Sequence, residues 1–171
     1  MRVPEFRIET HRQFLASRSF LYRNIEKCYA TRMTKAALNP IAIRGDVCTG
    51  CRACEIACVF RREGAFGTSS ARVRIVKEES EGADIPFLCR LCEDPACVAA
   101  CSADALRKDA DTGIIVLDPA ACTRCLDCRA ACPHDSVFAH PETGLPLICD
   151  LCQGDPACIK RCSTRAIRWE Q

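Results

Sequence analysis

The segment CTRCLDCRAACP, residues 122–133, sets four thiols at the spacing C-x2-C-x2-C-x3-C and ends on a proline. Three of the thiols lie within seven residues and can share one short loop. The fourth lies just downstream, where it can point away from that loop. Because proline fixes φ and blocks the continuation of a helix, Pro133 turns the chain away from the site. The spacing is typical of metal binding, and it recurs along the chain.

Sixteen of the 17 cysteines in this 171-residue chain fall into four groups of four. Group one repeats the spacing above, whereas groups two and four are stretched to C-x2-C-x4-C-x3-C and C-x2-C-x5-C-x3-C. The four groups are Cys48, Cys51, Cys54 and Cys58; Cys89, Cys92, Cys97 and Cys101; Cys122, Cys125, Cys128 and Cys132; and Cys149, Cys152, Cys158 and Cys162. Only Cys28 lies outside them, and we expect it to be a lone thiol.

The spacing favours iron–sulfur clusters over the two other chemistries that many cysteines allow. A disulfide scaffold needs an export signal, but residues 17–21 lack the second arginine of a twin-arginine motif and no apolar run follows them. A structural zinc site usually takes two well-separated C-x2-C pairs. Three thiols on one loop, with a fourth that reaches a neighbouring site, are typical of [4Fe–4S] binding. Sixteen thiolates provide for four such clusters.

The composition indicates that metal ligation supplies much of the folding free energy. Hydrophobic residues make up 49% of the chain, a figure that includes the cysteines, and aromatic residues only 6%. We therefore expect a thin apolar core and a poorly folded apo-chain. The net charge of +2 argues against a disordered chain, and no apolar stretch approaches the length of a membrane-spanning helix. No phosphate-binding loop or nucleic-acid patch is found, and we expect a cytoplasmic protein.

The four groups follow the order A-B-A-B, which indicates a duplicated unit. Between them, alternating apolar residues and turn signals predict short strands. Residues 72–76 form one, 105–107 pair with 114–117, 137–139 pair with 145–148, and 41–43 could pair with 166–169. Short helical turns are expected after each fourth cysteine. Five arginines beside cysteines either offset cluster charge or lie on a solvated surface: Arg52, Arg90, Arg124, Arg129 and Arg161.

The four-group layout across residues 41–171 resembles the four-cluster ferredoxin-like electron-transfer subunits of multi-subunit oxidoreductases. These subunits accompany dimethyl sulfoxide reductase, formate dehydrogenase, hydrogenase and carbon monoxide dehydrogenase. The compact fourth group, residues 149–158, is most similar to the small subunits associated with tungsten-dependent aldehyde oxidoreductases. The resemblance implies an α+β fold: tandem bacterial-ferredoxin-like dicluster modules, with short β-hairpins and short helices organised around four [4Fe–4S] clusters.

The resemblance also implies a nested exchange of ligands between groups. The outer module contains groups 48–58 and 149–162, and the inner module contains groups 89–101 and 122–132. The implied ligand sets are Cys48, Cys51, Cys54 and Cys162 for cluster 1; Cys89, Cys92, Cys97 and Cys132 for cluster 2; Cys122, Cys125, Cys128 and Cys101 for cluster 3; and Cys149, Cys152, Cys158 and Cys58 for cluster 4. The spacing alone shows the groups but not this pairing.

We therefore expect an electron-transfer subunit without catalytic residues of its own. Its partner would be a large tungsto- or molybdopterin subunit, with a flavin subunit, a ferredoxin or further copies of itself as the second redox partner. A free-standing polyferredoxin and a structural zinc-binding module are the alternatives. Residues 1–40 carry eight basic and three acidic residues and form a basic extension outside the resemblance, with a helix predicted over 11–30, unless Met33 is the natural start.

Overall fold

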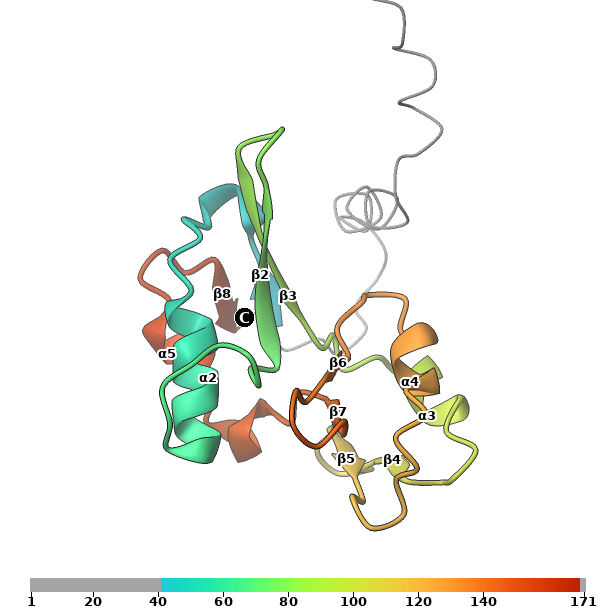
Figure 1. Cartoon of the computed structure of the whole chain (residues 1–171). Coiled ribbons are helices and arrows are strands. Elements are labelled where there is room, and N and C mark those ends of the chain that lie inside the picture. Colours follow the sequence, from blue (N-terminus) through green and yellow to red (C-terminus); the bar gives the residue numbers. More distant parts are fainter. Residues whose placement is uncertain (1–40, 170–171) are drawn as a thin grey trace, which may run out of the picture. The chain divides into compact units, whose positions relative to one another are not determined.

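Short strands and helices alternate with cysteine loops along residues 41–169, the part of the chain that the computed structural model describes (Figure 1). The predicted helix over 11–30 and Cys28 lie outside these residues. In chain order the elements are β1 (Ile41–Ile43), the 3-10 helix η2 (Gly45–Val47), α2 (Ala53–Glu63), β2 (Val73–Glu78), β3 (Ala83–Leu88), α3 (Ala96–Ala99), β4 (Leu106–Lys108), β5 (Ile115–Leu117), α4 (Asp127–Ala130), β6 (Phe138–Ala139), β7 (Pro146–Leu147), the 3-10 helix η3 (Leu151–Gly154), α5 (Ala157–Arg161) and β8 (Ile167–Trp169). These small helices and antiparallel strands confirm the α+β class.

The described strands form four two-stranded antiparallel sheets. Three pairings that the sequence predicts are confirmed: β4 with β5, β6 with β7, and the two ends of the described region, where Ile43 of β1 lies opposite Ile167 of β8. The β1–β8 pair joins segments more than 120 residues apart in the sequence. It therefore holds the loop of group one next to the C-terminal part of group four.

The strand predicted over 72–76 has a partner that the sequence analysis did not identify. This partner is β3, which pairs with β2 from Val73 opposite Leu88 to Glu78 opposite Ala83. Strand β3 contains Pro86, which cannot donate a backbone hydrogen bond. Proline is tolerated here because each strand of a two-stranded sheet has one free edge. The hairpin projects from the body of the fold beside β8 (Figure 1).

In groups two, three and four the helix precedes the fourth cysteine, so the prediction that helical turns follow it was wrong there; in group one α2 does continue past Cys58 to Glu63. Helices α3, α4 and α5 end just before Cys101, Cys132 and Cys162, and α2 contains both Cys54 and Cys58. The x3 spacing between the last two cysteines spans about one helical turn, which is why the helix forms there. After Cys101, Cys132 and Cys162 the chain turns sharply instead.

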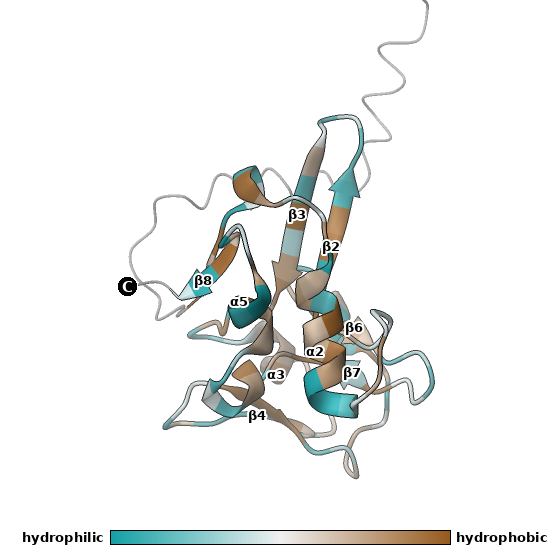
Figure 2. Cartoon of the chain, turned by 90° about the vertical axis from the view of Figure 1, so that its left-hand side faces the viewer, coloured by the Kyte–Doolittle hydropathy of each residue, from teal (hydrophilic) through white to brown (hydrophobic). Residues whose placement is uncertain are grey.

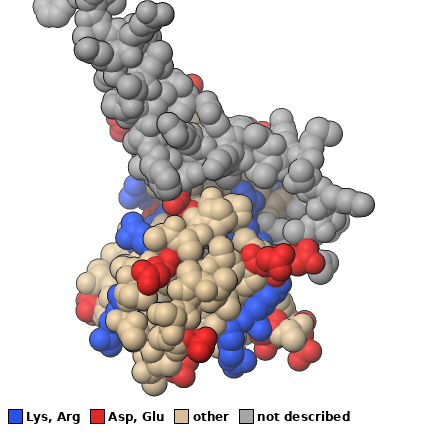
Figure 3. All heavy atoms as spheres, turned by 90° about the vertical axis from the view of Figure 1, so that its right-hand side faces the viewer, with Lys and Arg blue, Asp and Glu red and all other residues tan. Residues whose placement is uncertain are grey.

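Two apolar clusters support these elements. One includes Ile41, Val59, Val73, Leu88 and Ile167 together with Cys54, Cys58 and Cys158. The other includes Leu106, Ile115, Val137 and Ile148 together with Cys97 and Cys128. In both clusters buried cysteines stand beside the aliphatic residues, so each core is built around its thiols. Figure 2 shows the hydrophilic end of α2, and Figure 3 shows acidic and basic side chains mixed over one face.

Candidate metal centres

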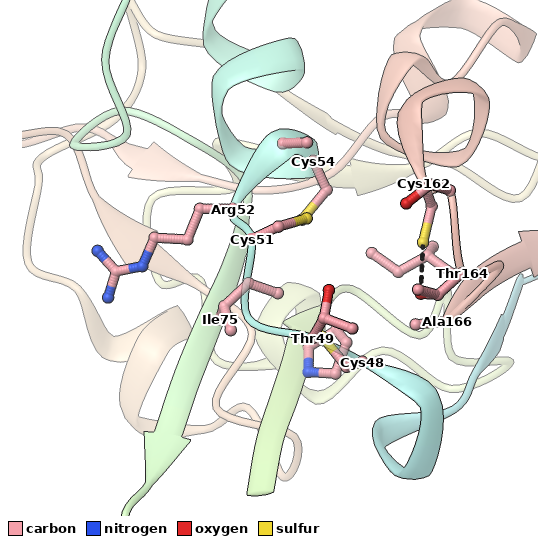
Figure 4. Close-up of a pocket in the computed structure, with 13 residues that line it drawn as sticks. Cys48, Thr49, Cys51, Arg52, Cys54, Ile75, Cys162, Thr164 and Ala166 are labelled. Atoms are coloured by element: carbon pink, nitrogen blue, oxygen red, sulfur yellow. Dashed lines mark hydrogen bonds between the residues drawn. The ribbon is translucent and has the colours of Figure 1, made fainter.

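Pocket one is a cavity that four thiols from the first and fourth groups line. Cys48, Cys51, Cys54 and Cys162 contribute to its wall, together with Ile75, Pro86 and Ile167 from the paired strands. The empty space of this cavity, including the part open to solvent, is about 320 Å³. In Figure 4 the sulfurs of Cys51, Cys54 and Cys162 point into a shared space, and the Cys162 Sγ lies 3.8 Å from Thr164 Oγ1. The loop that carries Cys48, Cys51 and Cys54 therefore closes against a cysteine more than 100 residues later in the sequence.

Pocket two takes three thiols from group four and one from group one, the reverse of pocket one. Cys149, Cys152 and Cys158 of group four and Cys58 of group one line it, with Val73, Leu88 and Leu151 as apolar neighbours. Its empty volume is about 330 Å³. Pocket one is lined by Cys54 in the first turn of α2, and pocket two by Cys58 and Arg62 further along the same helix. Helix α2 is therefore shared by both sites.

The inner groups are also brought together around the second apolar cluster. Burial, followed by the charge of Cys132, raises the pKa of Cys92 and of Cys97. Cys132 also packs against the apolar cluster that contains Cys97, so it lies near group two. Cys128 lies near Cys122, Cys125 and Cys97. Cys101 packs at the edge of the same apolar cluster as Cys128.

The ligand loops turn through residues with left-handed backbone angles. Gly50 and Arg52 have φ of 63° and 58° between the cysteines of group one. Leu91 in group two, Arg124 and Leu126 in group three, and Leu151 in group four adopt the same region. Successive right- and left-handed residues turn neighbouring amide N–H groups toward one side, which forms a concavity suited to an anion. A cluster with four thiolates is such an anion.

A second repeated turn follows three of the fourth cysteines. The N–H of Asp104, Asp135 and Arg165 donates to the carbonyl of Cys101, Cys132 and Cys162, at 3.1, 3.3 and 3.2 Å, and each of the three donors has a positive φ. After Cys132, this turn lets the next amide, Ser136 N–H, face the Cys132 Sγ at 3.5 Å. Cys58 lies inside α2 instead, and its sulfur receives a hydrogen bond from the Arg72 backbone at 3.3 Å.

Burial raises the pKa of eight of the sixteen thiols and so favours their protonated form in the apo-chain. It raises the pKa of Cys54 and of Cys89 to about 12 and that of Cys128 to about 11, and it also raises the pKa of Cys158. Loading a metal group requires thiolates, so ligation must release these protons. The buried thiols are therefore stable as ligands only when cationic metal replaces the proton.

Two carboxyl side chains stand behind pocket one. Glu55, only 2% exposed, follows Cys54 on α2 and accepts a hydrogen bond from the Ile75 backbone at 2.6 Å. Asp84 of β3 lies against Gly50, where a Cβ would meet its Oδ1 at 2.3 Å. The pKa of Cys54 is raised by burial and then by the charge of Glu55; burial likewise raises that of Cys48, with a further contribution from Asp84. Two carboxyl groups therefore stand behind the thiols of this pocket.

Two guanidinium groups stand at pocket two. Arg62 and Arg72 line the cavity, and both form ion pairs with Asp150, the Arg72 Nη1–Asp150 Oδ2 distance being 3.2 Å. The second carboxylate oxygen, Oδ1, also accepts the Cys152 N–H at 3.0 Å. The charges of Cys58, Cys149 and Cys152 all act on Arg72, whose pKa is nevertheless lowered, first by burial. The wall of this pocket is therefore electropositive.

The sequence analysis did not identify Arg62 or Arg72 as site residues, and the arginines it named lie mainly at the surface. Arg52, Arg124, Arg129 and Arg161 are exposed, and Arg90 is partly buried. Although Arg52 contributes to the wall of pocket one, its guanidinium points away from the sulfurs in Figure 4. Arg72 carried a weak signal, since it precedes the alternating strand β2. Arg62 carried none, because its partner Asp150 is 88 residues away.

The donor set fits a polynuclear cluster better than a single ion. Within residues 41–169, no three Cys, His, Asp or Glu side chains converge as a single metal ion requires. The thiols instead stand around a wider space, and all sixteen are free thiols in the structure. Four sulfur donors at the rim of one cavity are what a [4Fe–4S] cluster takes. Over the same residues, no helix is both long and apolar enough to cross a membrane.

The fold and the cysteine loops define a ferredoxin-like protein. The sequence model of the 4Fe-4S dicluster domain family matches residues 81–171, and the chain belongs to this family. It is 38% identical over 122 residues to the polyferredoxin-like subunit of an aliphatic sulfonate oxidoreductase from Pyrococcus furiosus, a match that covers 71% of this chain and 70% of that protein. The resemblance to iron–sulfur subunits of oxidoreductase complexes is therefore confirmed.

Two further relatives extend the comparison. The β subunit of an NADH-dependent phenylglyoxylate dehydrogenase from Aromatoleum evansii is 36% identical over 135 residues, covering 77% of this chain but only 30% of the subunit. The electron transfer subunit of a thiosulfate reductase from Salmonella typhi is 32% identical over 135 residues, covering 71% of this chain and 70% of that protein. Among solved structures, a chain of the active site complex BamBC of benzoyl coenzyme A reductase is 28% identical, with a TM-score of 0.46 and 76% of each chain covered.

Proposed function

We propose that this chain is an electron-transfer subunit that relays electrons through four [4Fe–4S] clusters between a catalytic oxidoreductase subunit and a further redox partner. The observation that carries the proposal is the composition of the two pockets. Each contains four thiols, three from one group and one from a group about 100 residues away in sequence. A duplicated set of such sites within a single chain suits a relay, since one site suffices for a simple carrier.

The ligand sets follow from the pockets and from the resemblance. In the outer module, Cys48, Cys51, Cys54 and Cys162 would hold cluster 1, and Cys149, Cys152, Cys158 and Cys58 would hold cluster 4. In the inner module, Cys89, Cys92, Cys97 and Cys132 would hold cluster 2, and Cys122, Cys125, Cys128 and Cys101 would hold cluster 3. Pocket one and pocket two support the sets for clusters 1 and 4. The position of Cys132 beside group two supports the set for cluster 2.

A [4Fe–4S] cluster bound at such a site supplies a centre that takes up and gives back one electron. The chain's own residues supply everything else. The thiolates anchor the centre, aliphatic residues such as Val73 and Leu88 exclude water, and backbone N–H groups face the sulfurs. Hydrogen bonds to sulfur, burial and nearby charge are the means by which a protein sets the reduction potential of such a centre.

The partner is proposed from the relatives. The relatives above are subunits of oxidoreductases that act on an aliphatic sulfonate, phenylglyoxylate and thiosulfate. A large catalytic subunit with a tungsten or molybdenum cofactor is the partner we favour, on the likeness of the compact fourth group to tungsten-dependent aldehyde oxidoreductase subunits. Native affinity purification of the tagged chain, followed by mass spectrometry and tungsten and molybdenum analysis, tests this. A metal-free partner would contradict the assignment.

Iron and sulfide analysis tests the cofactor content directly. The chain purified without oxygen should be brown and contain about 16 iron and 16 acid-labile sulfide, four of each for every cluster. About eight iron would contradict four clusters, and stoichiometric zinc in a colourless protein would support the zinc-binding alternative. Size-exclusion chromatography of a native extract separates a bound subunit from a free polyferredoxin, because the free carrier elutes alone.

A further inference from the structure

The two outer pockets have the same sulfur donors but opposite charges behind them. Pocket one has the carboxyl groups of Glu55 and Asp84, and pocket two has the guanidinium groups of Arg62 and Arg72. Lys77 lies 3.3 Å from Asp84, but its own side chain is 49% exposed. No arginine or lysine other than Arg52, which points into solvent, lines pocket one.

The arginines at pocket two have donors to spare. Asp150 pairs with one Nη atom of each, yet the Nε atoms of Arg62 and Arg72 are both buried and make no hydrogen bond within the described residues. A buried donor on a charged group that lacks a partner costs free energy. Both residues border a cavity lined by Cys58, Cys149, Cys152 and Cys158, so an anionic group held there would compensate these donors.

The charge balance at pocket two remains positive after the ion pairs are counted. Two guanidinium groups share one carboxylate, and the side chains of Arg62 and Arg72 are each only 22% exposed. Away from bulk water, charges act on one another more strongly than at the surface. At pocket one, the buried Glu55 accepts a hydrogen bond from the Ile75 N–H, and no lysine or arginine within residues 41–169 forms an ion pair with it.

We propose that Arg62 and Arg72, held by Asp150, raise the reduction potential of the centre at pocket two above that of the centre at pocket one, where Glu55 and Asp84 have the opposite effect. Reduction adds one negative charge to the centre. Cations nearby stabilise the reduced state and carboxylates destabilise it, which shifts the potential up or down. The inference rests on the proposed function, since it needs a cluster at each pocket.

The consequence is a fixed difference in reduction potential between the two centres of the outer module. At equilibrium an added electron is held preferentially at pocket two, beside Cys58 on α2, rather than at pocket one, beside Cys54 on the same helix. Arg62, Arg72 and Asp150 are positioning residues for this difference, since none of them is a predicted ligand. Two residues of this charge difference lie on α2: Glu55 behind pocket one and Arg62 at pocket two.

The test is a redox titration of the anaerobic full-length chain, followed by electron paramagnetic resonance. The variant Cys158→Ser identifies the titration step that belongs to pocket two, because it removes a predicted ligand of that centre alone. Arg72→Gln should then lower the reduction equilibrium constant of this step about threefold to tenfold, a tenfold change being about 59 mV for one electron. Arg62→Gln should act in the same direction, and Arg72→Lys, which keeps the charge, should retain most of the wild-type value.

Two variants that remove a negative charge should shift the equilibrium constants in the direction opposite to the arginine variants. Asp150→Asn removes the compensating carboxylate and should raise the same equilibrium constant, whereas Glu55→Gln should raise the constant of the step for pocket one. Lys160→Gln is the matched control, since Lys160 lies on α5 near the same cysteines with its side chain 63% exposed and should leave the step unchanged. These signs follow from the charge that each variant removes, and full iron content in each variant shows that its clusters are still bound.

If the potential of the pocket-two step is unchanged in both arginine variants, and both keep full iron content, the inference is overturned and the proposed function stays intact. A step that falls in Asp150→Asn, or that moves as far in Lys160→Gln as in Arg72→Gln, overturns it as well. A wild-type chain without a cluster at pocket two overturns both proposals, and its iron content reveals this before any titration. A pocket-two step below that of pocket one contradicts the proposed difference directly.

Discussion

Pocket one and pocket two are built from the same parts, yet their surroundings differ in sign. Each takes three thiols from one loop and a fourth from a distant group, and each is lined by a cysteine of α2. Behind the thiols, pocket one has carboxyl groups and pocket two has guanidinium groups. The two pockets share thiol ligands and left-handed loop turns, but they differ in the charged residues behind the thiols.

This difference indicates which features of the fold bind a metal group and which would tune it. The ligand loops repeat because their chemistry is fixed: thiols at set intervals and a backbone that turns through positive φ. The charged residues behind them do not repeat, so the two copies can differ in potential while they bind the same cofactor. Each prediction below removes one of these shared or differing features.

Removal of the metal should have the largest effect, because it removes what the two pockets share. Both apolar clusters include buried cysteines, so the apo-chain loses the centre of each. Structural metal sites contribute on the order of 10 kcal/mol each to folding, judged from structural zinc. Anaerobic chelation should abolish the cooperative thermal transition seen by circular dichroism. An apo-chain that melts like the loaded protein would contradict this expectation.

Loss of single ligands should reveal which cysteines share a site. If Cys48 and Cys162 hold the same cluster, then Cys48→Ser, Cys162→Ser and the double variant should each lose about four iron, not four and then eight. Cys162 together with Cys158 should lose about eight. Iron analysis of the purified variants decides between the two patterns.

Two controls accompany the ligand variants. Cys28→Ser should retain full iron content, because Cys28 belongs to no group. If the Cys48 and Cys162 double variant loses about eight iron, the exchange of ligands between the outer groups is wrong. The cysteines of group four would then bind their own cluster.

The two loops should also differ in their tolerance of a methyl group. Gly50 has φ of 63°, and an added Cβ would meet Asp84 Oδ1 at 2.3 Å, so Gly50→Ala combines backbone strain with a clash. We expect a loss of about 3 kcal/mol in the free energy of unfolding. Gly154→Ala, beside group four, meets nothing within 4 Å and should cost only the strain, about 1 kcal/mol.

A double variant separates the clash from the strain. Asp84→Ala should recover most of the clash contribution in the Gly50→Ala background, as measured by guanidinium unfolding of the loaded protein under anaerobic conditions. Equal losses in Gly50→Ala and Gly154→Ala would show that Asp84 does not crowd loop one.

The smallest expected effect concerns the buried carboxyl behind pocket one. Glu55→Ala leaves the Ile75 N–H buried without an acceptor, which should cost about 2 kcal/mol. Glu55→Gln keeps an acceptor oxygen and should cost less than half as much, although it removes the charge. Guanidinium unfolding midpoints compare the two variants. Equal costs would mean that the charge of Glu55, and not its hydrogen bond, stabilises the fold.

The sequence predicts the ligand groups and most strand pairs because both depend on local spacing. Cysteines at fixed intervals, and alternating residues around Asp111–Gly113 or Glu142–Gly144, are local signals, and the structure contains the expected hairpins. Strand β3 was missed because Pro86 is unfavourable in a strand. In groups two, three and four the helices were placed on the wrong side of the fourth cysteine, because the x3 spacing that forms a helical turn lies before that residue.

The charges behind the pockets could not be predicted, since they depend on tertiary contacts. Arg62 meets Asp150 across 88 residues, and Glu55 meets Ile75 across 20. Neither contact has a periodic or spacing signal. Arginines adjacent to cysteines in the sequence were the natural candidates, but four of these five are exposed.

Native mass spectrometry of the anaerobically purified chain tests the central claim most directly, because it counts the clusters on each intact molecule. The account predicts one dominant species with the mass of the polypeptide plus four [4Fe–4S] units, and loss of one unit in Cys48→Ser, in Cys162→Ser and in their double variant alike. A dominant species with two units, or with zinc in their place, would contradict it.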